Sequence, residues 1–242
     1  MIIHLPDAGC HNIYHFLILM VSTLKNINTI PHAIYIDMSN KYFEKSHNFV
    51  REILTVLYPN VIIYNSISYP ESTIIVPPHT LKDFNNDKEN YQSVYKYLHS
   101  ILIPHVLQYN IHNVYSKYIY ISRNDSPYRR VLNENDVMNY LEPKGFQKLI
   151  LTGIPLLEQM AIFHNAEVII SVHGAALTNC IFCKPGTQII ELNTDFLQTK
   201  KHFQDISEYF NLKYSRYTNT SSVHNFDMMA NDLIINDIPS LF

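Results

Sequence analysis

The amino-acid sequence predicts an α/β fold with two small Rossmann-like domains and a cleft between them. Short runs of β-branched residues alternate with longer segments of helical periodicity, which is the pattern of parallel sheets covered by helices. The series of strands and helices starts again near residues 110–116. The composition of the 242-residue chain, 47% hydrophobic and 16% charged, is that of a soluble globular protein that can bury a core.

The first predicted domain covers residues 1–112. Its apolar β-branched runs are expected to be strands at residues 2–5, 33–36, 61–64 and 73–76. Apolar residues at helical spacing predict the helices between and after them, at residues 12–26, 48–58 and 90–108. Pro59 and Asn60 end the second of these helices, and Pro104 is expected to kink the third.

The second predicted domain covers residues 113–242 and repeats the same alternation. Strands are expected at residues 118–121, 148–151, 168–172 and 188–192, and helices at 133–141, 155–164, 175–182 and 198–210. In parallel sheets of this kind the carboxyl ends of the strands face the ligand. The residues directly after each strand are therefore the first place to look for a site.

Charge and cysteine content narrow the class of partner. The net charge of −3 argues against a protein that binds nucleic acid non-specifically, which would need a basic face. The apolar run at residues 16–21 is too short for a membrane span, and neither a signal peptide nor an anchor is recognised. With three cysteines in the chain, we expect a protein of the reducing cytoplasm, without a membrane span. An oligomer remains possible.

A turn rich in small residues follows the strand predicted at residues 168–172. The chain has five glycines, and Gly174 stands between this strand and the next helix. Free N–H groups at such a helix start form an anion site, and small side chains let a phosphate approach. A tight turn that needs glycine for its φ angle is an equally good explanation. The candidate anion-binding residues are His173, Gly174, Ala175, Ala176, Leu177, Thr178 and Asn179.

Arginines are concentrated after the strand predicted at residues 118–121. Apart from Arg51 and Arg216, every arginine of the chain lies in the stretch 123–130. Arginine suits forked recognition of phosphate, and the position is a strand end, so this stretch favours phosphate binding. A solvated loop with surface ion pairs is the alternative.

Three further polar residues stand near the same predicted edge. Asn133 and Glu134 begin a helix, where capping alone would account for both. Glu191 lies near the end of an apolar strand, where a carboxylate commonly accepts hydrogen bonds from a ribose. An exposed strand-end glutamate is the equally weighted alternative.

The loop after the first strand supplies candidates for a general base. Asp7, His11 and His15 lie in or next to this loop, and histidine can take up a proton near neutral pH. The spacing of His11 and His15 also suits metal ligands, but a zinc-protease motif would need glutamate where Asn12 stands. No Asp-x-Asp pair is present to hold a divalent ion on a diphosphate, so no metal site is expected.

Several motifs, in order and spacing, resemble family 61 glycosyltransferases. The resemblance covers residues 117–192 with high specificity and reaches the first half through a segment similar to the family's Asn-x-x-His-Phe-Leu. The motifs are Asn12-Ile13-Tyr14-His15-Phe16-Leu17, Tyr120-Ile121-Ser122-Arg123, Arg129-Arg130-Val131-Leu132-Asn133-Glu134, Gly145-Phe146, Glu158-Gln159, Phe163, Ala166, His173-Gly174-Ala175-Ala176-Leu177-Thr178-Asn179 and Glu191.

The resemblance implies a GT-B fold and inverting transfer from a nucleotide sugar without a required metal. The nucleotide sugar, expected to be UDP-linked, is a co-substrate, and no separate cofactor is expected. The acceptor would be a hydroxyl group of a glycan or glycoprotein. Arg123, Arg130 and the turn at residues 173–179 would bind the donor diphosphate, with Asn133, Glu134 and Glu191 as further donor-binding residues.

One position departs from the family pattern. The family often has aspartate four residues after the histidine of its N-terminal motif, and this chain has Leu19 there. A base at that position is therefore absent, which leaves His15, His11 or Asp7. The rival hypotheses are a nucleotide-sugar epimerase or hydrolase with the same two domains, and an inactive protein that binds a nucleotide sugar without turnover.

Overall fold

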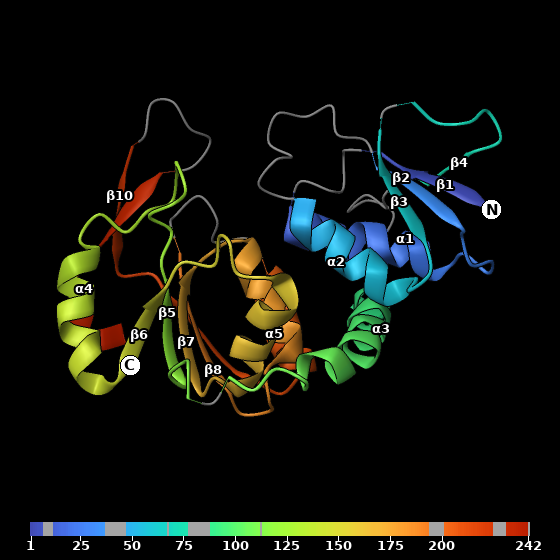
Figure 1. The fold of residues 1–242 in the computed structure, drawn as a ribbon. Coiled ribbons are helices and arrows are strands. Elements are labelled where there is room, and N and C mark those ends of the chain that lie inside the picture. The colour runs from blue at the N-terminus through green and yellow to red at the C-terminus, as the bar shows by residue number, and fades with distance from the viewer. Residues whose placement is uncertain are drawn as a thin grey trace. The chain divides into compact units, whose positions relative to one another are not determined.

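The computed structural model describes residues 1–6, 12–36, 47–66, 68–76, 88–111, 113–193, 201–224 and 231–241. The chain forms two compact units, Met1–His105 with Pro155–Leu157, and Val106–Ile154 with Glu158–Phe242 (Figure 1). Each unit contains its own parallel sheet, so the predicted α/β class is confirmed. The domain boundary after residue 112 and the GT-B arrangement stay predictions.

The first unit is built on a four-stranded parallel sheet in the order β3-β2-β1-β4. β1 (Ile2–Leu5) is central, and it pairs on its two sides with β2 (Ala33–Ile36) and β4 (Ile74–Ile75). β3 (Ile62–Asn65) forms the edge next to β2. The alternation of β1, β2 and intervening helices follows the predicted pattern.

The helices of the first unit lie close to the predicted ranges. A π-helix, His15–Met20, continues as α1 (Val21–Lys25), and the side chain of Asn12 accepts hydrogen bonds from the N–H groups of Tyr14 (2.9 Å) and His15 (3.3 Å). The apolar run 16–21 is buried in this unit. α2 (His47–Leu57) and α3 (Lys88–Val106) follow, and α3 extends through Pro104.

Within the described ranges, no helix is both long enough and apolar enough to cross a membrane.

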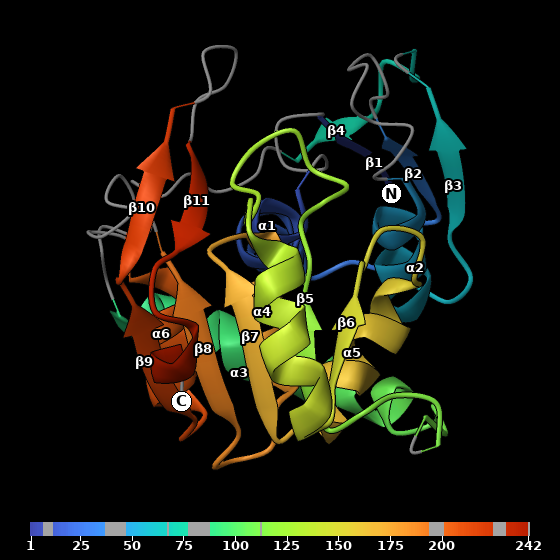
Figure 2. The ribbon, with the colours of Figure 1, turned by 90° about the vertical axis from the view of Figure 1, so that its left-hand side faces the viewer.

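The second unit is built on a five-stranded parallel sheet in the order β6-β5-β7-β8-β9 (Figure 2). The strands are β5 (Tyr118–Ile121), β6 (Phe146–Leu149), β7 (Val168–Val172), β8 (Gln188–Leu192) and β9 (Lys213–Tyr217). The predicted strand at 148–151 was misplaced by two residues. Phe146 is buried and pairs with Tyr118, whereas Ile150 lies outside the ladder and is exposed.

Helices cover both faces of this second sheet. Figure 1 shows α4 (Glu134–Leu141) and α5 (Leu156–Asn165) on opposite sides of it. A 3₁₀ helix, Ala175–Phe182, follows β7, and α6 (His202–Tyr209) lies between β8 and β9. A short 3₁₀ helix, Glu142–Lys144, extends α4. Another, Ile238–Leu241, follows the last strand. Side chains of α4, the sheet and the last strand share one hydrophobic core.

An antiparallel hairpin that the sequence did not predict is attached to the segment after β5. β10 (Thr220–Val223) pairs with β11 (Asp232–Ile235). The N–H of Leu132 donates to the carbonyl of Leu233 (2.8 Å), and the N–H of Leu233 donates to the carbonyl of Arg130 (2.9 Å). The Asn133 amide bonds both the N–H and the carbonyl of Ile235 (3.0 and 2.9 Å). The hairpin therefore fixes the chain just before α4.

Asp232 joins β11 to the segment before α4 through polar contacts with Arg130. Its buried carboxylate accepts from the backbone N–H of Arg130 (2.7 Å) and from the Arg130 guanidinium (2.7 Å). Asp232→Ala leaves that N–H without its acceptor, so we expect a loss of about 1–3 kcal/mol in the free energy of unfolding. Thermal denaturation measures it, with the exposed Asp237→Ala as control. Equal melting temperatures for the two variants would contradict a role for Asp232 in stability.

Candidate active site

The predicted arginine-rich stretch forms a folded loop at the carboxyl end of β5. The Ser122 hydroxyl accepts from the N–H of Asn124 (3.2 Å), and the N–H of Ser126 donates to the Arg123 carbonyl (2.9 Å). Arg123 Nη2 in turn donates to the Ser126 hydroxyl (2.9 Å). Arg129 lies in the left-handed region, at φ 58°, just before the chain joins the hairpin. We call residues 122–130 the arginine loop.

Two guanidinium groups of the arginine loop form no ion pair within the described residues. The guanidinium carbons of Arg123 and Arg129 lie 5.6 and 5.0 Å from the ring centre of Tyr128. Neither forms an ion pair with a carboxylate in the described part of the chain, and the Nε atom of each is buried without a partner there. Two neighbouring cations that are not engaged in an ion pair are suited to bind an anion.

Burial lowers the pKa values of both arginines. Burial, followed by the charge of Arg129, lowers the pKa of Arg123 to about 10. Burial also lowers the pKa of Arg129. Arg123 remains charged at neutral pH, but the positive form is destabilised where it stands. A bound anion would relieve that cost.

The turn at residues 173–179, which follows β7 and which we call the glycine turn, packs directly against the arginine loop. Arg129 Nη1 donates to the carbonyl of His173 (2.6 Å). Gly174 has φ 177°, an extended conformation open to any residue, so the suggestion that its φ demands glycine is wrong. A Cβ atom at this position would lie 2.5 Å from Arg123 Nη1. Glycine is needed here for the close approach of Arg123.

Gly174→Ala should displace the Arg123 side chain while the fold holds, because the clash involves the far end of a flexible side chain. We expect UDP affinity to fall about tenfold, the value of one charge-assisted contact. Calorimetric titration measures the affinity, and a melting curve on the same sample checks the fold. Unchanged affinity with an unchanged melting temperature would show that the position of Arg123 does not matter for binding.

The remaining residues of the glycine turn differ in which of their groups could bind an anion. The N–H groups of Ala175 and Ala176 belong to the first turn of the 3₁₀ helix, where N–H groups have no partner within the helix. The side chains of Leu177, Thr178 and Asn179 are fully buried, and Asn179 donates to the Gln159 side chain (3.3 Å). Donor contact through these three side chains is therefore not supported, and the main-chain N–H groups remain as candidates.

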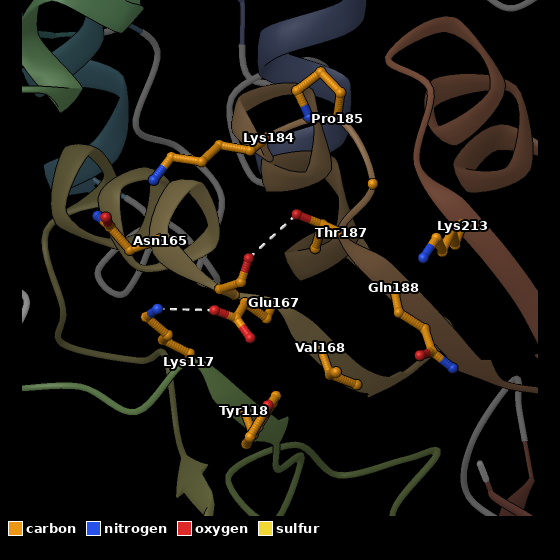
Figure 3. Close-up of a pocket in the computed structure, with 12 residues that line it drawn as sticks. Lys117, Tyr118, Asn165, Glu167, Val168, Lys184, Pro185, Thr187, Gln188 and Lys213 are labelled. Carbon is orange, nitrogen blue, oxygen red and sulfur yellow. Dashed lines mark hydrogen bonds and ion pairs between the residues drawn. The ribbon is translucent and has the colours of Figure 1, made fainter.

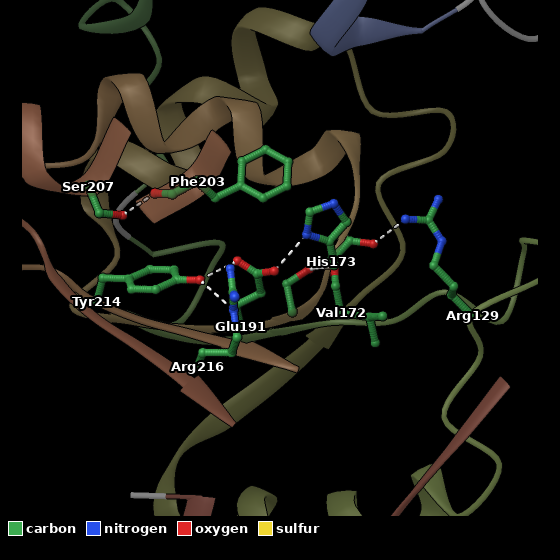
Figure 4. Close-up of polar contacts among 9 residues, drawn as sticks. Arg129, Val172, His173, Glu191, Phe203, Ser207, Tyr214 and Arg216 are labelled. Carbon is green, nitrogen blue, oxygen red and sulfur yellow. Dashed lines mark hydrogen bonds and ion pairs between the residues drawn. The ribbon is translucent and has the colours of Figure 1, made fainter. Parts of the chain in front are cut away.

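Glu191 lies behind the turn, in a buried hydrogen-bonded chain (Figure 4). Its carboxylate is 0% exposed, so the exposed strand-end interpretation is wrong, and a ribose cannot reach it in this structure. Oε1 accepts from His173 Nδ1 (2.6 Å), and Oε2 accepts from the hydroxyl of Tyr214 (2.6 Å). Arg216 Nε donates to the same hydroxyl (3.2 Å). Burial and Glu191 raise the pKa of Tyr214.

The sequence analysis missed Tyr214 and Arg216 because it did not predict β9. The alternation in Lys213–Tyr217, with Tyr214 and Arg216 on one face, was the available pattern.

Asn133 and Glu134 hold the scaffold of the arginine loop. Asn133 makes no side-chain cap on α4, because its amide is bound to β11. Glu134 is buried, and its Oε2 accepts from Asn124 Nδ2 (2.5 Å) and lies 3.6 Å from Lys148 Nζ. Burial and the charge of Glu134 raise the pKa of Tyr120. The contacts of both residues are structural, and a direct donor contact by either remains only a prediction.

Arg130 was predicted to bind the diphosphate, and the structure gives its guanidinium a different partner. The Asp232 carboxylate accepts hydrogen bonds from Arg130 Nη2 (2.7 Å) and Nε (3.2 Å). Arg129, one residue earlier, lies beside Arg123 instead. Arg129 is therefore a candidate for the second anion-binding position, and the predicted role of Arg130 stays a prediction.

Of the three candidate bases, the described residues include only His15. It lies partly buried at the start of the π-helix, with its ring centre 6.1 Å from that of Tyr14. Asp7 and His11 lie outside the described residues. Leu19 is buried in the same helix. Among the side chains that the structure describes, no group of three or more His, Cys, Asp or Glu could hold a metal ion.

An open pocket of about 560 Å³ lies at the opposite, amino edge of the second sheet (Figure 3). An ion pair between Lys117 and Glu167 (2.8 Å) stands in it. It is lined by Lys117, Tyr118, Asn165, Ala166, Glu167, Val168, Lys184, Pro185, Gly186, Thr187, Gln188 and Lys213. None of these residues belongs to the arginine loop or the glycine turn, so this pocket is a separate feature.

Comparison with known proteins finds relatives that share one name and match about a third of this chain. The chain is 36% identical over 76 residues to the EGF domain-specific O-linked N-acetylglucosamine transferase of Drosophila melanogaster, a match that covers 30% of this chain and 14% of that protein. It is 30% identical over 70 residues to the proteins of the same name from Canis lupus familiaris and Bos taurus, covering 27% of this chain and 13% of each. The matches thus span a small part of these relatives.

The family comparison covers more of the chain. The sequence profile of Glycosyltransferase 61 matches residues 11–190, a range that contains the π-helix, the arginine loop and the glycine turn. The chain therefore belongs to glycosyltransferase family 61.

Proposed function

We propose that this protein is an inverting glycosyltransferase that moves a sugar from a nucleotide sugar to a hydroxyl group of a glycan or glycoprotein. The observation that carries the proposal is the pair of guanidinium groups, Arg123 and Arg129, which face the glycine turn. Within the described ranges of the chain, neither has a carboxylate partner. They stand at the carboxyl ends of β5 and β7, the edge where parallel sheets bind ligands.

The proposed reaction uses this charge to assist departure of the nucleotide. The acceptor oxygen attacks the anomeric carbon, its proton passes to a base, and the bond from that carbon to the diphosphate breaks. The electron pair of that bond goes to the phosphate oxygen. Arg123, Arg129 and the N–H groups of Ala175 and Ala176 would stabilise the developing negative charge. His15, His11 and Asp7 are the candidates for the base.

The donor that we propose to test first is UDP-N-acetylglucosamine. The relatives named above are N-acetylglucosamine transferases by name, and the UDP linkage follows the expectation from the family resemblance. Because the matched segment is a small part of those proteins, their acceptor is not carried over.

Binding of the diphosphate should not require a metal. The sequence lacks an Asp-x-Asp pair, and the arginine loop supplies positive charge that a divalent ion would otherwise provide. We expect UDP affinity, measured by calorimetry, and sugar transfer, measured with labelled UDP-N-acetylglucosamine and an acceptor panel, to persist in excess chelator. Loss of both, restored by manganese or magnesium, would contradict metal independence.

The same labelled donor separates the rival hypotheses. Transfer to an acceptor supports the proposal, whereas release of free sugar or an altered nucleotide sugar would identify a hydrolase or an epimerase. Binding without any turnover over the whole acceptor panel would favour the inactive nucleotide-sugar-binding protein that Leu19 suggests.

A further inference from the structure

We infer that Arg216, Tyr214 and Glu191 are positioning residues for His173, which they orient to donate a hydrogen bond from Nε2 to the donor diphosphate. The inference rests on the proposed function and deepens it. It replaces the ribose contact expected for Glu191 with a role through the histidine.

In the hydrogen-bonded series from Arg216 to His173, the direction of each bond follows from Arg216. A guanidinium can only donate, so Arg216 Nε gives its hydrogen to the Tyr214 oxygen (3.2 Å). The single hydroxyl hydrogen of Tyr214 is then directed to Glu191 Oε2 (2.6 Å). Glu191, as a carboxylate, has only acceptors left for His173, so Nδ1 carries a hydrogen and donates it to Oε1 (2.6 Å).

Fixing Nδ1–H determines what the other ring nitrogen can do. Nε2 has no hydrogen-bond partner among the described residues. In the neutral ring it would be an acceptor, and only the charged ring makes it a donor. Phosphate oxygens are acceptors, so contact with a diphosphate requires the charged ring. Glu191 holds a carboxylate oxygen 2.6 Å from Nδ1, the arrangement of the carboxylate–histidine pairs of hydrolases.

The position of the ring is also set from several sides. Phe203 of α6 packs against it, with ring centres 5.0 Å apart, and Arg129 holds the backbone carbonyl of His173 (2.6 Å). His173 is 8% exposed, whereas Glu191, on its Nδ1 side, is 0% exposed. Because Nδ1 faces the buried Glu191, Nε2 lies on the other side of the ring. Figure 4 shows Nδ1 directed toward Glu191, with Arg129 beside the backbone carbonyl.

The charges around His173 mean that its proposed hydrogen bond to the diphosphate depends on Glu191. On the positive side are Arg129 at its carbonyl, Arg123 against Gly174, and Arg216 beyond Tyr214. A further charge on the imidazole would be opposed by these cations, and Glu191 is the carboxylate in direct contact that offsets them. During transfer, the electron pair of the broken sugar–phosphate bond goes to the phosphate oxygen. Nε2–H would stabilise that charge without giving up its proton.

The test is binding of UDP-N-acetylglucosamine by calorimetry over about pH 5 to 8, the range in which histidine changes its charge. The diphosphate of a nucleotide sugar lacks the second phosphate ionisation, with pKa about 6, that would complicate the use of UDP. We expect the affinity of the wild-type protein to fall as pH rises, because loss of the second ring proton removes the Nε2–H donor.

Two variants examine the positioning residues. Glu191→Gln keeps the shape and removes the charge, and we expect affinity about tenfold lower at the acid end of the range, with a flattened pH dependence. Tyr214→Phe removes one hydroxyl. It should lower the affinity and flatten the pH dependence as well, but less than Glu191→Gln does. Tyr115→Phe is the matched control, since it removes a similar tyrosine–glutamate hydrogen bond, Tyr115 to Glu158 (2.8 Å), at a site without a proposed role.

The outcomes separate this inference from the proposed function. If the wild-type protein does not bind the nucleotide sugar, the proposed donor is wrong and the inference fails with it. If it binds, and the arginine variants weaken binding, but Glu191→Gln and Tyr214→Phe leave the pH profile like that of Tyr115→Phe, only the inference is overturned. A wild-type affinity that does not vary with pH would also overturn it, because His173 would then not act as a charged donor.

Discussion

Replacing Arg123 and Arg129 together with glutamine is expected to lower UDP affinity by about 10²- to 10⁴-fold, because each charge-assisted contact contributes about 1.5–3 kcal/mol. The melting temperature should hold or rise, since burial lowers the pKa values of both arginines in the folded protein and the charge of Arg129 lowers that of Arg123 further. Calorimetric titration with UDP, paired with thermal denaturation, gives both quantities.

The matched control lies in the same loop. Arg130→Gln removes an arginine whose guanidinium is bound by Asp232, so its effect should fall on stability and leave UDP affinity near that of the wild-type protein. The reverse result, with affinity lost in Arg130→Gln and kept in the double variant, would restore the assignment predicted from the sequence and contradict the one made from the structure.

The His15→Ala variant should reduce sugar transfer by about 10²- to 10⁴-fold, the usual contribution of a positioned general base. His15 lies partly buried at the start of the π-helix, and Leu19 supplies no carboxylate one helical turn further on. The donor-binding residues that we propose belong to the second unit, so UDP affinity should be nearly unchanged. Turnover at saturating donor and acceptor is the measurement.

Three companion variants decide where the base is. The exposed His32→Ala, in the same unit, is the control for loss of a histidine and should keep wild-type turnover. Asp7→Ala and His11→Ala are measured in parallel, because both belong to the predicted set of bases. Near-normal turnover in His15→Ala with loss in Asp7→Ala would move the assignment to the carboxylate.

Strand periodicity predicted most of the framework that carries the site. The strands β5, β7 and β8 coincide with the predicted ranges, because each is a short buried run in which hydrophobicity alone marks the element. That was sufficient to place the arginine-rich stretch and the glycine turn at strand ends. β6 was misplaced because the apolar residues 149–151 continue beyond the ladder.

The choice between neighbouring arginines could not be made from the sequence. Arg129 and Arg130 have the same chemistry, and they differ only in their contacts, which are the His173 carbonyl for Arg129 and Asp232 for Arg130. Arg130 faces Asp232, which is 102 residues away, and no local pattern reveals a partner at that distance. The surroundings of Glu191 could not be predicted either, because its partner Tyr214 belongs to β9, a strand that the sequence did not predict.

The attachment of β11 to residues 130–133 has a consequence for the order of folding. Each of the side-chain bonds in this attachment joins residues 102 positions apart, and closing so long a stretch of chain is slow and entropically costly. During synthesis, the strands β5 to β8 can pair before residues 232–235 have left the ribosome. The arginine loop would acquire its final anchor only after that point, so nucleotide-binding competence would arise late, after most of the second sheet had formed.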